Sequence, residues 1–181
     1  MRSTKKLTLS AILTALGVVF MTLGALIPTL DLTVCALSSL VVALVYIEIG
    51  SPYTYLVWLA TTLLSGLFFP GSILWLEYLL VFGIFPILKA YIEKAPKGLW
   101  LILKLLFCNG AFFLMIKLYE LIFKLPFFDE GESFFGLTGG ILIPIIVVLI
   151  NIMFIAYDMF ITVMVRVYLA KYRQKFKHLL K

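Results

Sequence analysis

Ionisable and amide side chains that interrupt long apolar runs are the residues of this chain that could do chemistry. Glu77, Lys117 and Asn151 stand inside three different apolar runs. In hydrocarbon such groups are costly, so they mark either a functional site or a buried pair. At the helical rise, Glu77 lies about 6 Å and Lys117 about 12 Å below the outer ends of their runs, so the two side chains can meet. Together with Tyr78 as an aromatic wall, these residues predict an outward-facing substrate pocket with a polar floor.

Each of these residues also has a structural interpretation. Glu77 and Lys117 fit a buried pair as well as a pocket, and the long side chain of Lys117 can instead reach the membrane interface. Asn151 and Asp158 are seven residues apart, so they share a helical face. Asp158 falls at the same depth as Lys104, and a structural Lys104–Asp158 pair is the favoured interpretation of these two charges.

Enzymatic chemistry finds little support in the residue pattern. The single histidine, His178, lies in the basic tail, so no histidine cluster is available for a catalytic metal. No GxSxG, HExxH, phosphate-binding glycine loop or paired-aspartate metal motif occurs. Cys35 and Cys108 lie in separate apolar runs and match neither a metal-ligand pattern nor a disulfide framework. We expect no catalytic residue, no cofactor and no resident metal.

The elements that must position these residues are membrane-spanning helices. Hydrophobic residues make up 64% of the chain and charged residues 13%, against about 45–50% and about 25% in soluble domains. Continuous apolar blocks exclude the alternating pattern of a transmembrane β-barrel. Because about 20 helical residues cross the hydrocarbon core, the sequence predicts one all-α, polytopic membrane domain over residues 1–181. Its six transmembrane helices are predicted at residues 7–27, 32–49, 53–69, 73–91, 99–125 and 141–169. Gly83 and Pro86 predict a kink near Phe82.

Basic residues predict the orientation of this bundle. They gather in the N-terminal tail, in the fourth-to-fifth connection with Lys89, Lys94 and Lys97, and in the tail from Arg166 onwards. Six spans place these regions on one side, and cytoplasmic segments are the ones rich in Lys and Arg. Both termini are therefore expected in the cytoplasm, in a plasma membrane. The net charge of +6 concerns orientation and anionic lipid rather than nucleic acid.

Small residues line the first predicted helix. Ala11 and Ala15 share one face, and an adjoining stripe holds Ser10, Thr14, Gly17 and Gly24. In lipid, helices recognise each other largely through close approach across small residues. These residues predict a docking face for another helix, either of a partner or of this chain's own bundle.

Six helices in 181 residues, cytoplasmic ends, no internal repeat and a basic leader running into LTLSAILTALGVV resemble the S components of energy-coupling factor (ECF) transporters. The residue likeness lies mainly in the Ala-x-x-x-Ala pattern of the first helix, here Ala11 and Ala15, with some likeness further on, including LLSGLFFPGS. The resemblance implies a subunit that captures a vitamin, a vitamin precursor or a metal ion. It further implies a transmembrane T subunit, contacted through Ala11 and Ala15, and two ATPase subunits that power uptake.

An organic micronutrient is the favoured cargo. Metal-transporting members use N-terminal ligands that include histidine, and the N-terminus MRSTKK has none. Substrate residues differ among subfamilies, so the resemblance assigns none here. The alternative is a small structural protein of the MreD-like type, acting in envelope assembly or cell shape, whose polar residues would pair internally. A membrane enzyme or lipid-handling protein is disfavoured by the missing catalytic residues.

Overall fold

The computed structural model describes residues 3–125 and 139–173, and within these ranges it contains helices and no strands. The acidic connection expected before the last helix, at 126–138, and the tail beyond Arg173 with His178 lie outside the described residues. The predicted fold class is confirmed, with helices close to the predicted bounds. They are α1 (Ser3–Leu26), η1 (Pro28–Leu30), α2 (Asp31–Glu48), α3 (Ser51–Phe68), α4 (Leu74–Glu77), η2 (Tyr78–Phe82), α5 (Phe85–Ile92), α6 (Lys97–Phe123), α7 (Gly139–Val167) and η3 (Tyr168–Tyr172).

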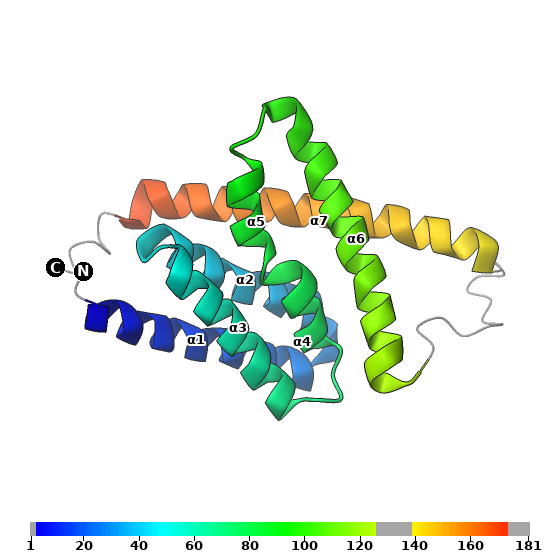
Figure 1. Cartoon of the computed structure of the whole chain (residues 1–181), viewed down its shortest axis with the longest axis horizontal. Helices are drawn as coiled ribbons and strands as arrows, with labels where there is room; N and C mark the ends of the chain where they lie inside the picture. The colour runs from blue at the N-terminus through cyan, green and yellow to red at the C-terminus, as the bar shows by residue number, and fades with distance from the viewer. Residues whose placement is uncertain (1–2, 126–138, 174–181) are drawn as a thin grey trace.

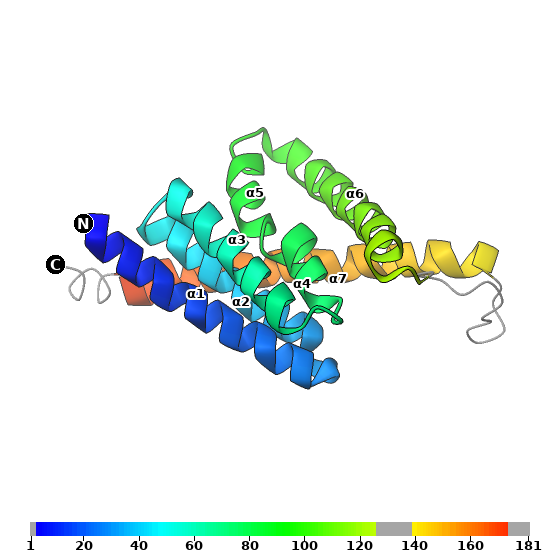
Figure 2. The same ribbon diagram turned by 60° about the horizontal axis from the view of Figure 1, so that its bottom comes forward.

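The central helix is α2, which contacts α1, α3, α5 and α7. Figures 1 and 2 show α1, α2 and α3 packed as one group, with α7 running along the molecule and α6 crossing α7 at a steep angle. The start of α1 and the end of η3 lie at the same end of the molecule (Figure 1). Arg173 forms an ion pair at 3.3 Å with Glu48 at the end of α2. A chain that crosses a membrane an even number of times has both of its ends on the same side, which agrees with this arrangement.

The surface of the bundle is apolar, as contact with lipid requires. Within the described residues, five segments are long and apolar enough to cross a membrane: Thr4–Leu26, Pro28–Glu48, Leu74–Ile92, Lys97–Phe123 and Ile143–Tyr172. The sixth, α3, has 18 residues and turns its polar side chains inward: Thr54 and Thr61 are fully buried, whereas Leu63 and Leu67 are exposed. Since polar groups in lipid must find partners inside the protein, this inside-out pattern also suits a membrane. The chain is a membrane protein.

The small residues of α1 divide between the interior and the surface. Gly17 and Gly24 are buried, and a Cβ atom on Gly24 would overlap the side chain of Val34 on α2. These two glycines therefore permit α1 to approach α2 and α3 of the same chain. Ala11 and Ala15 point the other way and are exposed. Of the predicted docking residues, Ser10 is buried, Thr14 is half-buried, and the two alanines are the most accessible from outside the bundle.

The fourth span breaks where Gly83 and Pro86 predict a kink. Pro86 has no N–H, so the carbonyl of Phe82 loses its helical donor. The hydroxyl of Tyr157 on α7 donates to that carbonyl at 3.0 Å. Just before it, η2 is a π-helical turn, in which the N–H of Gly83 donates to the carbonyl of Tyr78 at 2.7 Å. Such turns widen a helix locally and are common at functional sites.

Gly83→Ala tests whether this turn needs a residue without a side chain. A Cβ atom at position 83 would lie 2.8 Å from the carbonyl oxygen of Tyr78 and would also overlap the Trp58 indole. We expect a loss of about 1–3 kcal/mol of stability, measured as a lower thermal unfolding temperature in detergent. The matched control is Gly110→Ala on α6, where no atom lies within 4 Å. Equal unfolding temperatures for the two variants would contradict the close packing at Gly83.

Candidate functional site

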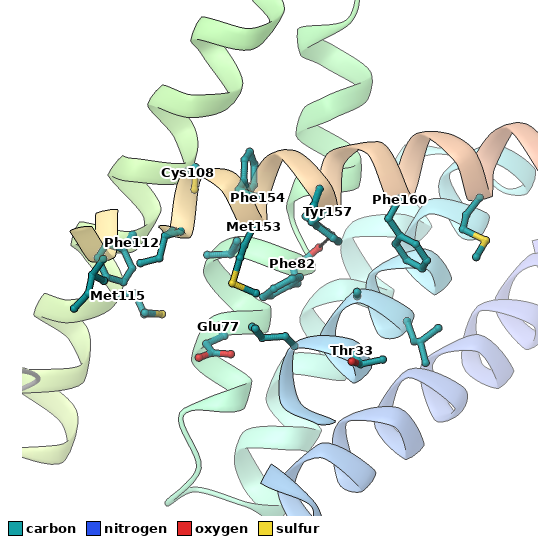
Figure 3. Close-up of a pocket in the computed structure, with 18 residues that line it drawn as sticks. Thr33, Glu77, Phe82, Cys108, Phe112, Met115, Met153, Phe154, Tyr157 and Phe160 are labelled. Carbon is teal, nitrogen blue, oxygen red and sulfur yellow. Dashed lines mark hydrogen bonds between the residues drawn. The ribbon is translucent and has the colours of Figure 1, made fainter. Parts of the chain in front are cut away.

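A cavity of about 690 Å³ lies between α2, the broken fourth span, α6 and α7 (Figure 3). This volume is in the range of about 300–1,000 Å³ that small-molecule sites occupy. Its walls are apolar and rich in aromatic and methionine side chains. The lining residues are Leu32, Thr33, Ala36, Leu37, Glu77, Val81, Phe82, Cys108, Phe112, Met115, Ile146, Ile150, Met153, Phe154, Ala156, Tyr157, Phe160 and Met164.

Glu77 is the one charged side chain among these lining residues. It ends α4, one turn after Leu74, and Figure 3 shows its carboxylate at the cavity between α6 and α2. Its Oε2 atom is buried and has no hydrogen-bond partner among the described residues. Burying a carboxylate oxygen without a hydrogen bond is unfavourable, so this oxygen is a candidate contact for a ligand.

Residues of the π-helical turn form part of the cavity wall. Val81 and Phe82 line the cavity just after Glu77, and the Phe82 ring meets the Tyr157 ring edge-on with centroids 4.8 Å apart. Because the Tyr157 hydroxyl donates to the Phe82 carbonyl, it is already engaged. The Thr33 hydroxyl and the Cys108 thiol are then the other polar groups of the lining. The site therefore offers one carboxyl group, few other hydrogen-bonding groups and much aromatic surface.

A buried network of four charges joins α5, α6 and α7. Lys104 on α6 lies 2.9 Å from Oδ2 of Asp158 on α7 and 3.0 Å from Oε1 of Glu93, so the predicted Lys104–Asp158 pair is present. Lys89 also bonds Asp158, lies 3.2 Å from Glu93, and donates to Thr162 at 2.7 Å. Both lysines are buried, with 7% and 6% exposure. Two cations and two anions cancel, which makes the network structural.

The assignment of Lys89 to a connecting loop is wrong. Lys89 lies within α5 (Phe85–Ile92), and its side chain turns into the bundle toward Asp158. From the sequence, a lysine this near a helix end is expected in the following loop, because its long side chain can reach water. Here two acidic groups, Glu93 and Asp158, hold it inside instead.

Asn151 is engaged in a second structural contact between α6 and α7. Its amide nitrogen donates to Oδ1 of Asn109 at 3.1 Å, and the Asn109 amide donates back to Asn151 at 3.0 Å. Asn151 also donates to the carbonyl of Val147. Reciprocal amide bonds of this kind hold helices together in lipid. Asn151 does not line the cavity.

Of the four predicted pocket residues, the structure brings only Glu77 to the cavity. Lys117 is 59% exposed at its side chain and pairs with Glu120 on the same helix at 3.0 Å. Tyr78 is fully buried in the core of the bundle, in a cluster with Met21 and Cys35. The predicted polar floor of Glu77, Lys117 and Asn151 is therefore not assembled.

Sequence reasoning expected walls of Tyr78, Trp75 and Phe residues; Phe residues do line the cavity, but which ones could not be identified, and Tyr78 and Trp75 are not among the lining residues. Phe112, Met153, Phe154 and Phe160 are apolar residues in apolar spans, and nothing in their types separates a cavity wall from a lipid contact. Their helical spacing gives a face only once the rotation of α6 and α7 is known. Among the described residues no group of three or more His, Cys, Asp or Glu is placed to hold a metal ion.

Asp158→Asn tests the structural role of the charge network. The substitution leaves Lys89 and Lys104 with Glu93 as their acid, and breaking a buried pair in this way costs about 3–5 kcal/mol. We expect a much lower thermal unfolding temperature in detergent. Adding Lys104→Met to Asp158→Asn removes the excess charge and is expected to restore most of the loss. If the single and double variants unfold at the same temperature, the four charges do not act as one network.

The function of this chain has to be inferred from its own sequence and structure. No family model, curated protein or solved structure matches it. The apolar helices show a membrane protein. Beyond that, the cavity with Glu77 and the exposed alanine pair on α1 are the two features that bear on what the bundle does.

Proposed function

We propose that this chain is the substrate-capture subunit of an ECF-type transporter that takes up an organic micronutrient, a vitamin or a vitamin precursor. It sits in the plasma membrane with both termini in the cytoplasm. Its cargo binds inside the six-helix bundle, and a transmembrane T subunit with two ATPase subunits powers release to the inside. The observation that carries the proposal is the cavity of about 690 Å³ with an unpaired carboxylate in its wall.

A capture subunit needs a ligand site, and a structural protein does not. The cavity is large enough for a small organic molecule. It begins near one end of the bundle, with Thr33 in the first turns of α2 and Glu77 in α4. The opposite end holds the start of α1 and the end of η3 (Figure 1). A ligand that enters beside Thr33 and Glu77 approaches from the side away from the chain ends.

A capture subunit also needs a second surface for its energising partner. None of the residues that line the cavity belongs to α1. Ala11 and Ala15 are exposed on α1, and flanking residues of the same face, Ile12 and Leu16, are exposed as well. A flat face of this kind permits a partner helix to approach closely. The two surfaces can therefore be occupied at the same time.

Charge supports the proposed orientation. Lys5 and Lys6 lie at the start of α1, and Lys171 and Arg173 lie at the end of the chain's described part. Asp31 and Glu77 lie toward the other end. Because basic residues favour the cytoplasmic side, this distribution favours cytoplasmic termini and a cavity reached from outside.

The alternative is a structural membrane protein of the MreD-like type. Two observations favour it: the balanced network around Asp158 and the Asn109–Asn151 pair, in which polar side chains satisfy one another inside the bundle. Such pairs stabilise any helix bundle, however, and they leave Glu77 unpaired. The cavity and its carboxylate have no role in a scaffold.

Co-purification from native membranes tests the proposed function. The tagged chain is expected to recover a T subunit and two ATPases, identified by mass spectrometry. Ala11→Trp and Ala15→Trp place a bulky ring on the α1 face, and each is expected to reduce recovery at least about tenfold, a loss of about 1.4 kcal/mol of binding. The matched control is Leu106→Trp, since Leu106 on α6 is 69% exposed. It should leave recovery unchanged.

A different set of partners would overturn the proposal. Recovery of envelope-synthesis or cytoskeletal proteins, with no small molecule bound, would establish the scaffold instead. Equal recovery by all three tryptophan variants would remove Ala11 and Ala15 from the partner surface.

A further inference from the structure

We propose that the cavity binds an organic cation, a molecule with an aromatic or apolar body and one positively charged group that pairs with Glu77. This inference takes the proposed capture function and names the chemical class of its cargo. It rests on three properties of the cavity: the shape of its walls, the sign of its charge and the absence of any other charged lining residue among those described.

The walls suit a flat or apolar body. Phe82, Phe112, Phe154 and Phe160 contribute aromatic rings, which pack well against other rings. Met115, Met153 and Met164 add polarisable thioethers that adapt to irregular shapes. Aromatic faces also attract cations, most strongly where water is excluded. The walls therefore favour a positively charged aromatic ligand over a sugar-like or strongly polar one, which would need many hydrogen bonds.

The charge of the cavity selects a cation. The Oε2 atom of Glu77 is buried without a hydrogen-bond partner among the described residues. Lys117, the cation that sequence reasoning paired with Glu77, is bound to Glu120 and exposed. Lys89 and Lys104 are neutralised by Glu93 and Asp158. A ligand cation supplies the counter-charge that none of the described basic side chains provides.

Anionic and neutral ligands fit this site less well. The lining includes no Lys, Arg or His among the described residues, so a carboxylate or phosphate ligand would face Glu77 with nothing to neutralise it. A neutral ligand without a hydrogen-bond donor would leave the buried Oε2 atom of Glu77 without a partner. The acyl chain of a lipid fills apolar space, and it too leaves the carboxylate without a partner.

Binding of a matched set of probes tests the inference. The full chain is purified into phosphatidylcholine nanodiscs and titrated with benzyltrimethylammonium, with its neutral isostere neopentylbenzene and with the anion benzenesulfonate. We expect the cation to bind at least about tenfold more tightly than either of the other two, as a desolvated cation–aromatic and ion-pair contact allows. Glu77→Gln is expected to remove this preference.

Two further variants separate a lost site from a lost fold. Glu120→Gln makes the same substitution on exposed α6, outside the cavity, and is expected to keep the full cation preference. Ala156→Phe adds a ring to the cavity wall and retains Glu77, so it is expected to weaken binding of the cation at least about tenfold even if Glu77→Gln does not fold. Unfolding temperatures of all variants are measured in the same nanodiscs.

Specific results would overturn the inference. Equal binding of the cation and its neutral isostere would show that Glu77 carries no charge in the cavity. A cation preference that survives Glu77→Gln would place the site elsewhere. Unchanged binding of the cation to the Ala156→Phe variant would show that the probe does not bind in the cavity. Cation binding without recovery of a T subunit and ATPases would sustain this inference and end the transporter proposal. Recovery of those partners without a cation preference would do the reverse.

Discussion

The carboxylate of Asp158 organises half of this bundle. It accepts Lys89 from α5 and Lys104 from α6, while its own helix, α7, runs along the molecule. In hydrocarbon neither lysine is stable without an acid beside it, so the positions of the two helices are tied to that of α7. The cavity depends on the same tie, because α6 and α7 form two of its walls.

The first three helices and the later helices are held together by different kinds of side chain. In α1, α2 and α3, small and hydroxyl residues such as Gly24, Ser38 and Thr54 sit inside, which permits close packing with leucines outside. In the later helices, aromatic residues and the charge network join α6 to α7, which it crosses at a steep angle (Figure 1). Close packing leaves no room for a ligand. The cavity lies where the later helices meet α2, between α2, the π-helical turn, α6 and α7.

Sequence patterns predicted the helices far better than the site. The lengths of apolar runs gave the spans, Gly83 and Pro86 gave the break, and depth along the helices paired Lys104 with Asp158. The depth of a residue along its helix does not reveal which neighbour its side chain faces. Asn151 faces Asn109 and Lys117 faces outward because of the orientation of α6 about its own axis, which the sequence does not specify. Glu77 was found because an acid among apolar residues stands out. Its aromatic neighbours were not, since a Phe in a cavity wall and a Phe in lipid look alike in sequence.

The charge network also bears on how the chain is assembled. A protein is synthesised from its N-terminus, so α5 and α6 bring Lys89 and Lys104 to the membrane before Asp158 has been made. At that stage Glu93 is the one acid of the network present, and one positive charge remains uncompensated. Integration of the middle helices is therefore completed by the last one. Until α7 has joined α5 and α6, one lysine of the network has no acid of its own, so the charge balance of the middle helices depends on the last helix.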